Sequence, residues 1–125
     1  MYGDEEGSIP PGVLLDTIGT IMFTNTRTAI EHVPARQWAS WRDANDAVII
    51  DVREPMEWAM GTLPESETIS LAALPSAATD MDRDQAILLV CATGNRSTTG
   101  AAWLTSMGFT KVASLAGGVV ALGMA

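Results

Sequence analysis

Two short apolar runs place the strongest constraint on how this chain folds. They span residues 47–52, which read AVIIDV and are interrupted only by Asp51, and residues 86–90, which read AILLV. A strand with one face in water alternates polar and apolar residues, whereas a strand covered on both faces is apolar throughout. Both runs have the length and β-branched character of buried strands. They therefore predict a parallel sheet with a layer of helices on each side.

The segments around these runs alternate between strand and helix patterns. Helices are predicted from Pro34 to the turn at residues 43–46, over 55–60, over 96–107, and as a short stretch after Gly118. Further strands are predicted at residues 68–71 and 111–115. Strands that alternate with helices along the chain favour right-handed crossovers and a parallel arrangement. We therefore predict an α/β fold with a mostly parallel central sheet flanked by helices on both faces.

Length and composition exclude several classes of function. At 125 residues and 47% hydrophobic residues, the chain has the size of one domain and enough apolar side chains for a core. Seven basic against 15 acidic residues give a net charge of −8, which argues against binding to nucleic acid. A single cysteine excludes an internal disulfide, and with a single histidine it leaves too few ligands for an ordinary zinc site. We predict no metal and no cofactor.

Residues 1–29 do not continue the α/β pattern and are set apart as an N-terminal arm or extra element, which leaves a domain at 30–125. The chain begins with acidic residues where a secretory signal is basic, and its apolar stretch falls short of the about 20 residues of a membrane span. We expect a soluble, cytoplasmic protein without a membrane partner. Residues 12–29 fit both a strand and a helix pattern. Their apolar side chains are expected to be buried, either by packing on the domain or in the interface of a homodimer.

Cys91 directly follows the second apolar run and opens a loop before the predicted helix 96–107. The loop consists of Cys91, Ala92, Thr93, Gly94, Asn95, Arg96 and Ser97. Sites in open parallel sheets lie beyond the carboxyl ends of the strands, and a loop that turns into a helix directs backbone N–H groups at its centre. Those groups favour the thiolate of Cys91. Gly94 permits a positive φ, Arg96 adds positive charge, and Ser97 or Thr98 is expected to cap the helix.

A lone cysteine is more often an inert core residue, but its position at a strand end before a glycine-containing loop favours a functional role. The loop resembles the active-site loop of the rhodanese family, C-R-x-G-x-R-S. Three further segments resemble that family in the same order: residues 49–58 its D-V-R-E-x-x-E-[FYW] segment, residues 61–64 its G-H-I-P turn, and residues 115–118 its L-x-G-G segment. The likeness covers about residues 30–125.

This resemblance implies a sulfurtransferase that moves sulfane sulfur from a donor such as thiosulfate to a nucleophilic acceptor. Cys91 would carry the sulfur as a persulfide, held by residues 92–97, and cyanide, a thiol or a protein acceptor would remove it. The chain departs from the family at Ala92, where Arg or Lys is frequent, at Thr62, where His is usual, and at Leu122, where Trp is common. These departures favour weak use of thiosulfate or a different donor.

The same residues leave two alternatives. One is a non-enzymatic module of this fold, acting as a sulfur carrier or as a regulatory domain that binds a protein. The other, weaker one is a phosphatase or arsenate reductase, whose loop has one residue more than the four between Cys91 and Arg96.

The residues outside the loop are assigned supporting or structural roles. Asp51 ends a buried strand near the loop, and Arg53 is expected to pair with Glu57 and brace the following turn. His32 is expected at the surface rather than as a base, and Trp103 in the core.

Overall fold

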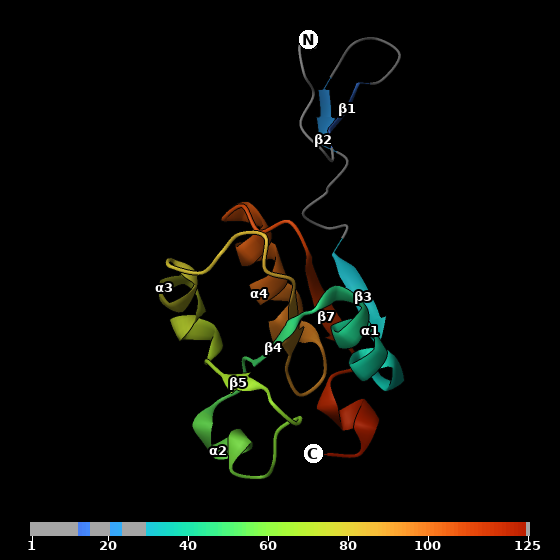
Figure 1. Ribbon diagram of the computed structural model, residues 1–125, viewed down its shortest axis with the longest axis vertical. Helices are drawn as coiled ribbons and strands as arrows, with labels where there is room; N and C mark the ends of the chain where they lie inside the picture. The colour runs from blue at the N-terminus through green and yellow to red at the C-terminus, as the bar shows by residue number, and fades with distance from the viewer. Residues whose placement is uncertain (1–12, 16–20, 24–29, 125) are drawn as a thin grey trace.

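The protein forms a parallel sheet between layers of helices (Figure 1). The computed structural model describes residues 13–15, 21–23 and 30–124. Within them, five strands pair in the order β3-β7-β6-β4-β5, and every neighbouring pair in this sheet is parallel. The strands are β3 (Glu31–Pro34), β4 (Val48–Asp51), β5 (Glu67–Thr68), β6 (Ile87–Val90) and β7 (Val112–Ala116). The predicted α/β fold with a parallel sheet is confirmed.

The two apolar runs of the sequence are neighbouring strands inside this sheet. β6 pairs with β4 on one side and with β7 on the other, and all four of its residues are buried. Along β6, Ile87 and Leu89 pack into one hydrophobic cluster, while Leu88 and Val90 pack into a second. Because successive side chains of a strand point to opposite faces, a strand covered on both sides must be apolar at every position.

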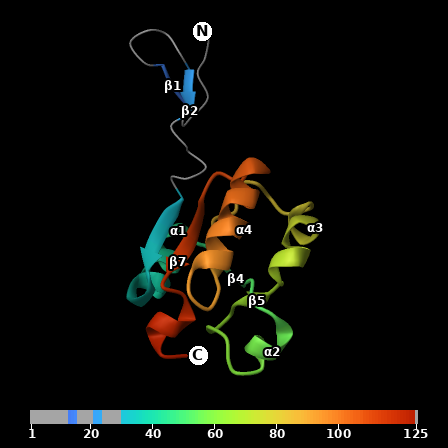
Figure 2. The same cartoon turned by 180° about the vertical axis from the view of Figure 1, so that it is seen from behind.

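Helical segments lie on both faces of the sheet and, in the case of α2 (Pro55–Trp58), beyond the carboxyl ends of its strands (Figures 1 and 2). The others are η1 (Ala35–Gln37), α1 (Trp38–Asn45), η2 (Leu71–Ala73), α3 (Leu74–Ala78), α4 (Asn95–Ser106) and η3 (Val119–Leu122). One core cluster contains buried residues of α3 and α4, and the other contains residues of η1 and η3 with side chains of α1 packed against it. Of the helices in the described ranges, none combines the length and apolar character needed to cross a membrane.

The structure corrects three local predictions. Pro34 is the last residue of β3 and does not begin a helix. Sequence analysis missed β3 because only Val33 of this edge strand is buried, and proline is tolerated at such an edge. The strand expected at 68–71 is limited to Glu67–Thr68, and Leu71 begins the unpredicted pair of η2 and α3. Trp103 of α4 is 37% exposed and is not a core residue.

The N-terminal segment contributes two short strands. β1 (Val13–Leu15) and β2 (Ile21–Phe23) pair antiparallel, which matches the extended one of the two predicted patterns at these residues. Residues 1–12, 16–20 and 24–29 lie outside the described part of the chain. The separate arm and the homodimer through residues 12–29 stay predictions.

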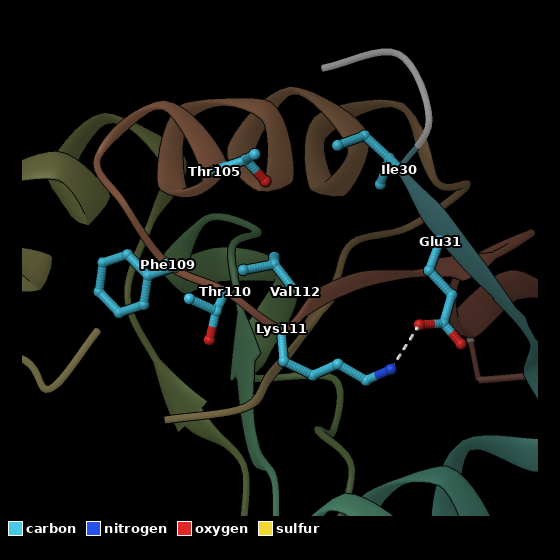
Figure 3. A pocket seen from close by; sticks show the side chains of 7 residues that line it. All are labelled: Ile30, Glu31, Thr105, Phe109, Thr110, Lys111 and Val112. Atoms are coloured by element: carbon cyan, nitrogen blue, oxygen red, sulfur yellow. Dashed lines mark ion pairs between the residues drawn. The ribbon is translucent and has the colours of Figure 1, made fainter. Parts of the chain in front are cut away.

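A pocket of about 210 Å³ lies at the amino ends of β3 and β7 (Figure 3). Its lining includes Ile30 and Phe109, and the ion pair of Lys111 and Glu31, 3.4 Å apart, lies at its rim. Cys91 follows the carboxyl end of β6, at the other end of the sheet. The pocket is therefore separate from the loop that the sequence identified.

Candidate active site

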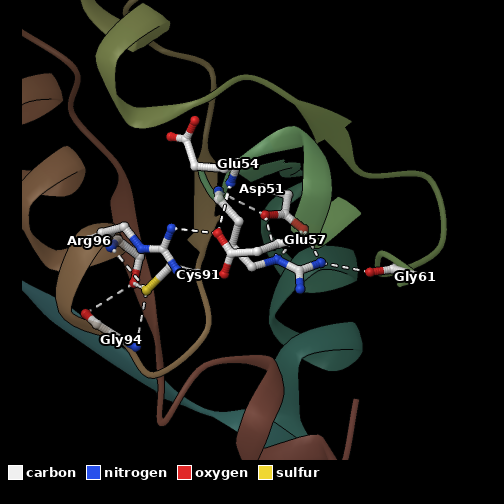
Figure 4. A network of polar contacts seen from close by, with 9 residues as sticks. Asp51, Glu54, Glu57, Gly61, Cys91, Gly94 and Arg96 are labelled. Atoms are coloured by element: carbon white, nitrogen blue, oxygen red, sulfur yellow. Dashed lines mark hydrogen bonds and ion pairs between the residues drawn. The ribbon is translucent and has the colours of Figure 1, made fainter. Parts of the chain in front are cut away.

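The sulfur of Cys91 lies under the first turn of α4. Cys91 follows β6 directly and is 1% exposed. Its Sγ accepts hydrogen bonds from the backbone N–H of Gly94 at 3.0 Å and from that of Ser97 at 3.3 Å (Figure 4). The N–H groups of a first helical turn have no partner within the helix, so they are free to bind an anion. Cys91 and the start of α4 are thus arranged to stabilise negative charge on sulfur.

The helix begins differently from the prediction. Gly94, at φ +104°, is the residue that precedes α4, and as a glycine it has no side chain to cap the helix. The hydroxyls of Ser97 and Thr98 instead donate to the carbonyl oxygen of Gly94, at 3.1 and 2.7 Å. The prediction that one of them caps the helix is wrong, because the sulfur of Cys91 takes the N–H of Ser97.

Ser114 is a buried polar neighbour that sequence analysis missed. It belongs to β7, and its Oγ lies 2.6 Å from the Oγ of Ser97, which in turn lies 3.4 Å from the sulfur of Cys91. A buried hydroxyl without a partner is costly, so the pair of serines locks the base of the loop against β7. The signal in the sequence was a serine in the middle of an otherwise apolar strand.

The Gly117-Gly118 segment holds the loop from its other side. The N–H of Val119 donates to the carbonyl of Cys91, and the N–H of Val120 to that of Ala92, both at 3.0 Å. Gly118 has φ +62°, and a Cβ built on it would overlap the carbonyl group of Ala92. The two backbones approach each other closely here, and only glycine permits this.

We predict that Gly118→Ala displaces the loop. The added methyl group meets backbone rather than a movable side chain, so a loss of about 1–3 kcal/mol in the free energy of unfolding is expected. Urea denaturation measures this loss. Gly123→Ala is the control for a positive φ in open space, because Gly123 has φ +77° and ψ 19° with nothing near the position of an added Cβ, whereas Gly118 has ψ −165°. Equal losses in the two variants would show that the contact with Ala92 adds nothing to the cost of replacing glycine.

Arg96 binds Glu57 of α2, and the predicted pair of Arg53 and Glu57 is wrong. Nη1 and Nη2 of Arg96 donate to Oε1 and Oε2 of Glu57 at 2.7 and 2.8 Å. Oε1 of Glu57 also accepts the backbone N–H of Glu54 at 3.0 Å, as part of the capping box that begins α2. One carboxylate thus connects α2 to the loop (Figure 4).

This contact keeps both groups charged. The hydrogen bond from Arg96 lowers the pKa of the Glu57 carboxyl from 4.5 to about 2, in spite of the opposing effect of burial. The same hydrogen bond raises the pKa of Arg96. The positive charge that the sequence places beside Cys91 is therefore present, but a carboxylate balances it.

Asp51 and Arg53 form a separate, fully buried ion pair. Each side chain is 1% exposed, and Arg53 Nη2 donates to Asp51 Oδ2 at 2.8 Å and to the carbonyl of Gly61 at 2.6 Å. Asp51 is paired in register with Val90, so its side chain points to the face opposite to Cys91. The pair joins the end of β4 to the turn at Gly61 and braces it, without reaching the sulfur.

The other residues singled out in the sequence are the rest of the loop and His32. Ala92 and Gly94 are half-buried, and Thr93 and Asn95 are exposed. His32 is exposed on β3, as predicted. The described ranges hold no cluster of three or more His, Cys, Asp or Glu side chains placed to bind a metal ion.

Comparison with known proteins identifies the family of this site. The profile of the Rhodanese-like domain family matches residues 35–125. Thiosulfate sulfurtransferase GlpE of Pseudoalteromonas translucida is 34% identical over 93 residues, which is 74% of this chain and 89% of that protein. GlpE of Stutzerimonas stutzeri is 34% identical over 91 residues, or 73% of this chain and 83% of its own.

Solved structures agree. Reduced CoADR-RHD of Bacillus anthracis superposes with a TM-score of 0.67 at 28% identity, over 76% of this chain and 17% of that one. A human single-domain sulfurtransferase has the same fold, with a TM-score of 0.66 at 22% identity, over 73% and 93% of the two chains. The chain is therefore a member of the rhodanese family and a sulfurtransferase of the rhodanese type.

Proposed function

We propose that this sulfurtransferase carries sulfane sulfur as a persulfide on Cys91. The observation that carries the proposal is the position of Sγ, which accepts two backbone N–H groups at the start of α4. These donors stabilise the attacking thiolate without a histidine base. Relatives with about a third of their residues identical are named thiosulfate sulfurtransferases, which supports thiosulfate as one donor.

The chemistry is a double displacement at sulfur. The thiolate of Cys91 attacks the outer sulfur of thiosulfate and forms a new S–S bond, while sulfite leaves with the electron pair of the old bond. A nucleophilic acceptor, such as cyanide or a thiol, then attacks the terminal sulfur and releases the Cys91 thiolate. Charge balances in both steps and no external oxidant or reductant is needed, which fits a ping-pong reaction without a cofactor.

The other loop residues have distinct roles in this proposal. Gly94 and Ser97 supply the backbone donors, Ala92, Thr93 and Asn95 form the wall of the loop, and Arg96 fixes the loop to α2 through Glu57. Asp51 and Arg53 are positioning residues, because they hold the end of β4 and the neighbouring turn without touching the sulfur.

Intact-mass spectrometry tests the proposal. After incubation with thiosulfate, and separately with a hydropersulfide, the chain is expected to gain one sulfur atom and to lose it when cyanide is added. Absence of the gain with both donors would overturn the persulfide proposal. A chain that loads sulfur but does not turn over with cyanide or small thiols is instead a sulfur carrier. The uncharged Ala92 in the loop is the observation that favours this second candidate.

We predict that Ala92→Arg increases thiosulfate turnover. Ala92 lies in the loop beside the sulfur, and a guanidinium there would add a charge-assisted contact to an anionic donor. An increase of about tenfold in kcat/KM is expected, which corresponds to about 1.4 kcal/mol. Steady-state kinetics with thiosulfate and cyanide measure it. Ala92→Met is the control for side-chain length, and an equal gain in both variants would contradict the role of charge.

A further inference from the structure

We propose that Glu57 sets the donor class of this enzyme. By balancing Arg96, it disfavours dianions such as thiosulfate, so that the preferred donor is a hydropersulfide with at most one negative charge and an uncharged body. This inference rests on the proposed persulfide chemistry of Cys91, and it adds a specificity residue that lies outside the loop.

The loop around the sulfur carries little positive charge. Residues 91–97 contain one cationic side chain, Arg96. Glu57 binds it directly, with Nη1 of Arg96 2.7 Å from Oε1 of Glu57. The carboxylate thus balances the guanidinium, and the thiolate of Cys91 adds a further negative charge when it reacts. A dianion that approaches this site meets net repulsion.

The guanidinium of Arg96 is also occupied by its partner. Both terminal nitrogens of Arg96 already donate to Glu57, at 2.7 and 2.8 Å. An anionic donor can bind these two nitrogens only if it displaces the carboxylate of Glu57. A bidentate contact between arginine and a carboxylate is the strong form of this ion pair, so displacing it is costly. Glu57 is held in place in turn by the N–H of Glu54, so α2 anchors the carboxylate beside the loop.

Three exposed apolar side chains, Met56, Met60 and Val120, lie on the elements that contact the loop or next to them. Their side chains are 79%, 67% and 44% exposed. Met56 and Met60 belong to α2 and the turn after it, which meets the loop through Glu57 and Arg96. Val120 belongs to η3, which meets the loop through its N–H bond to Ala92. In both views α2 and the chain end after η3 lie at the same end of the molecule (Figures 1 and 2). Exposed apolar side chains on these elements favour a donor with an uncharged organic body over thiosulfate, whose leaving group is sulfite.

The transfer itself balances for a hydropersulfide. The thiolate of Cys91 attacks the outer sulfur of R–S–SH, the donor S–S bond breaks, and R–S⁻ leaves with the electron pair. The proton stays on the new persulfide of Cys91. The leaving thiolate R–S⁻ carries one negative charge, whereas sulfite, the leaving group of thiosulfate, carries two. Repulsion from the nearby carboxylate is therefore weaker for R–S⁻ as it forms in the site.

The test compares two donors on three chains. Loading of Cys91 is followed by intact-mass spectrometry with thiosulfate and with freshly generated benzyl hydropersulfide. Glu57→Gln keeps the side-chain length and an oxygen for the capping box. It replaces a carboxylate that accepts from both terminal nitrogens of Arg96 by an uncharged amide with one acceptor oxygen. Glu31→Gln removes the same charge at the far end of the sheet, where Glu31 pairs with Lys111. Circular dichroism verifies that each variant is folded.

In Glu57→Gln, the rate of loading from thiosulfate is expected to rise about tenfold relative to that from benzyl hydropersulfide. In Glu31→Gln the ratio of the two rates should stay that of the unaltered protein. A ratio in Glu57→Gln that is unchanged or shifted toward the hydropersulfide would overturn the inference.

A salt series on the unaltered protein tests the same inference without any variant. Because salt screens repulsion, loading from thiosulfate should become faster as sodium chloride is raised, and loading from benzyl hydropersulfide should change less. Slower loading from thiosulfate at high salt would mean that the site attracts the dianion, and the inference would fail while the persulfide proposal stands. Loading from neither donor would overturn the proposed function itself.

Discussion

A chain in which Cys91 is replaced by serine is expected to take up no sulfur from any donor. The hydroxyl cannot form an S–S bond, and Cys91 is the single cysteine of the sequence, so no second thiol can substitute for it. Loading and turnover should therefore fall to the level of a sample without protein. Intact-mass spectra after incubation with thiosulfate and with a hydropersulfide measure the loading.

The serine chain should remain folded, because its hydroxyl accepts the same N–H groups of Gly94 and Ser97 that the sulfur now accepts. Matching thermal unfolding curves of the two proteins provide the control. A gain of sulfur mass in the serine variant would place the sulfur on another residue and would contradict the proposed mechanism.

Replacing Arg53 by methionine is expected to have the largest effect on stability. The change leaves the carboxylate of Asp51 buried without its partner, in a position that is 1% exposed. Breaking a buried ion pair in this way costs about 3–5 kcal/mol, against a total of about 5–15 kcal/mol for a typical domain. Urea denaturation, with the free energy of unfolding extrapolated to water, measures the loss.

Two further variants separate the unpaired charge from lost packing. In Asp51→Leu/Arg53→Met, both charges are removed, and much of the loss should be recovered because no buried charge is left alone. Lys111→Met removes the exposed pair with Glu31, where both side chains are about half exposed, and should change stability by less than about 1 kcal/mol. If the double variant is no more stable than Arg53→Met, packing and the bond to Gly61 dominate, and the role given to the charge is wrong.

Those parts of the fold that depend on local pattern were predictable. The runs at residues 47–52 and 86–90 became β4 and β6, and the helix expected at 96–107 became α4. The edge strand β3 was missed because it buries only Val33, and the η2–α3 segment because its five-residue helix is too short to show a period. A hydrophobic pattern in the sequence predicts a helix or strand only where that element has several buried side chains.

The candidate site divides in the same way. That Cys91 follows a buried strand, that a glycine and an arginine come after it, and that a helix begins there are properties of neighbouring residues, so they were predictable from the sequence. The partner of Arg96 is Glu57, which is 39 positions away, and Ser114 is 17 positions from Ser97. These contacts arise from the packing of elements that are distant in the sequence, and no local pattern predicts them.

A local stretch of sequence specifies the backbone conformation and which side chains are buried. It does not specify which charged groups from distant segments form ion pairs with one another. Arg53, Arg96 and Glu57 offer two possible ion pairs. Arg53 forms its ion pair with Asp51, which lies on the face of the sheet opposite to Cys91. Glu57 is therefore left to form its ion pair with Arg96 of the loop. The charge presented to a sulfur donor therefore follows from the packing of α2 against the loop.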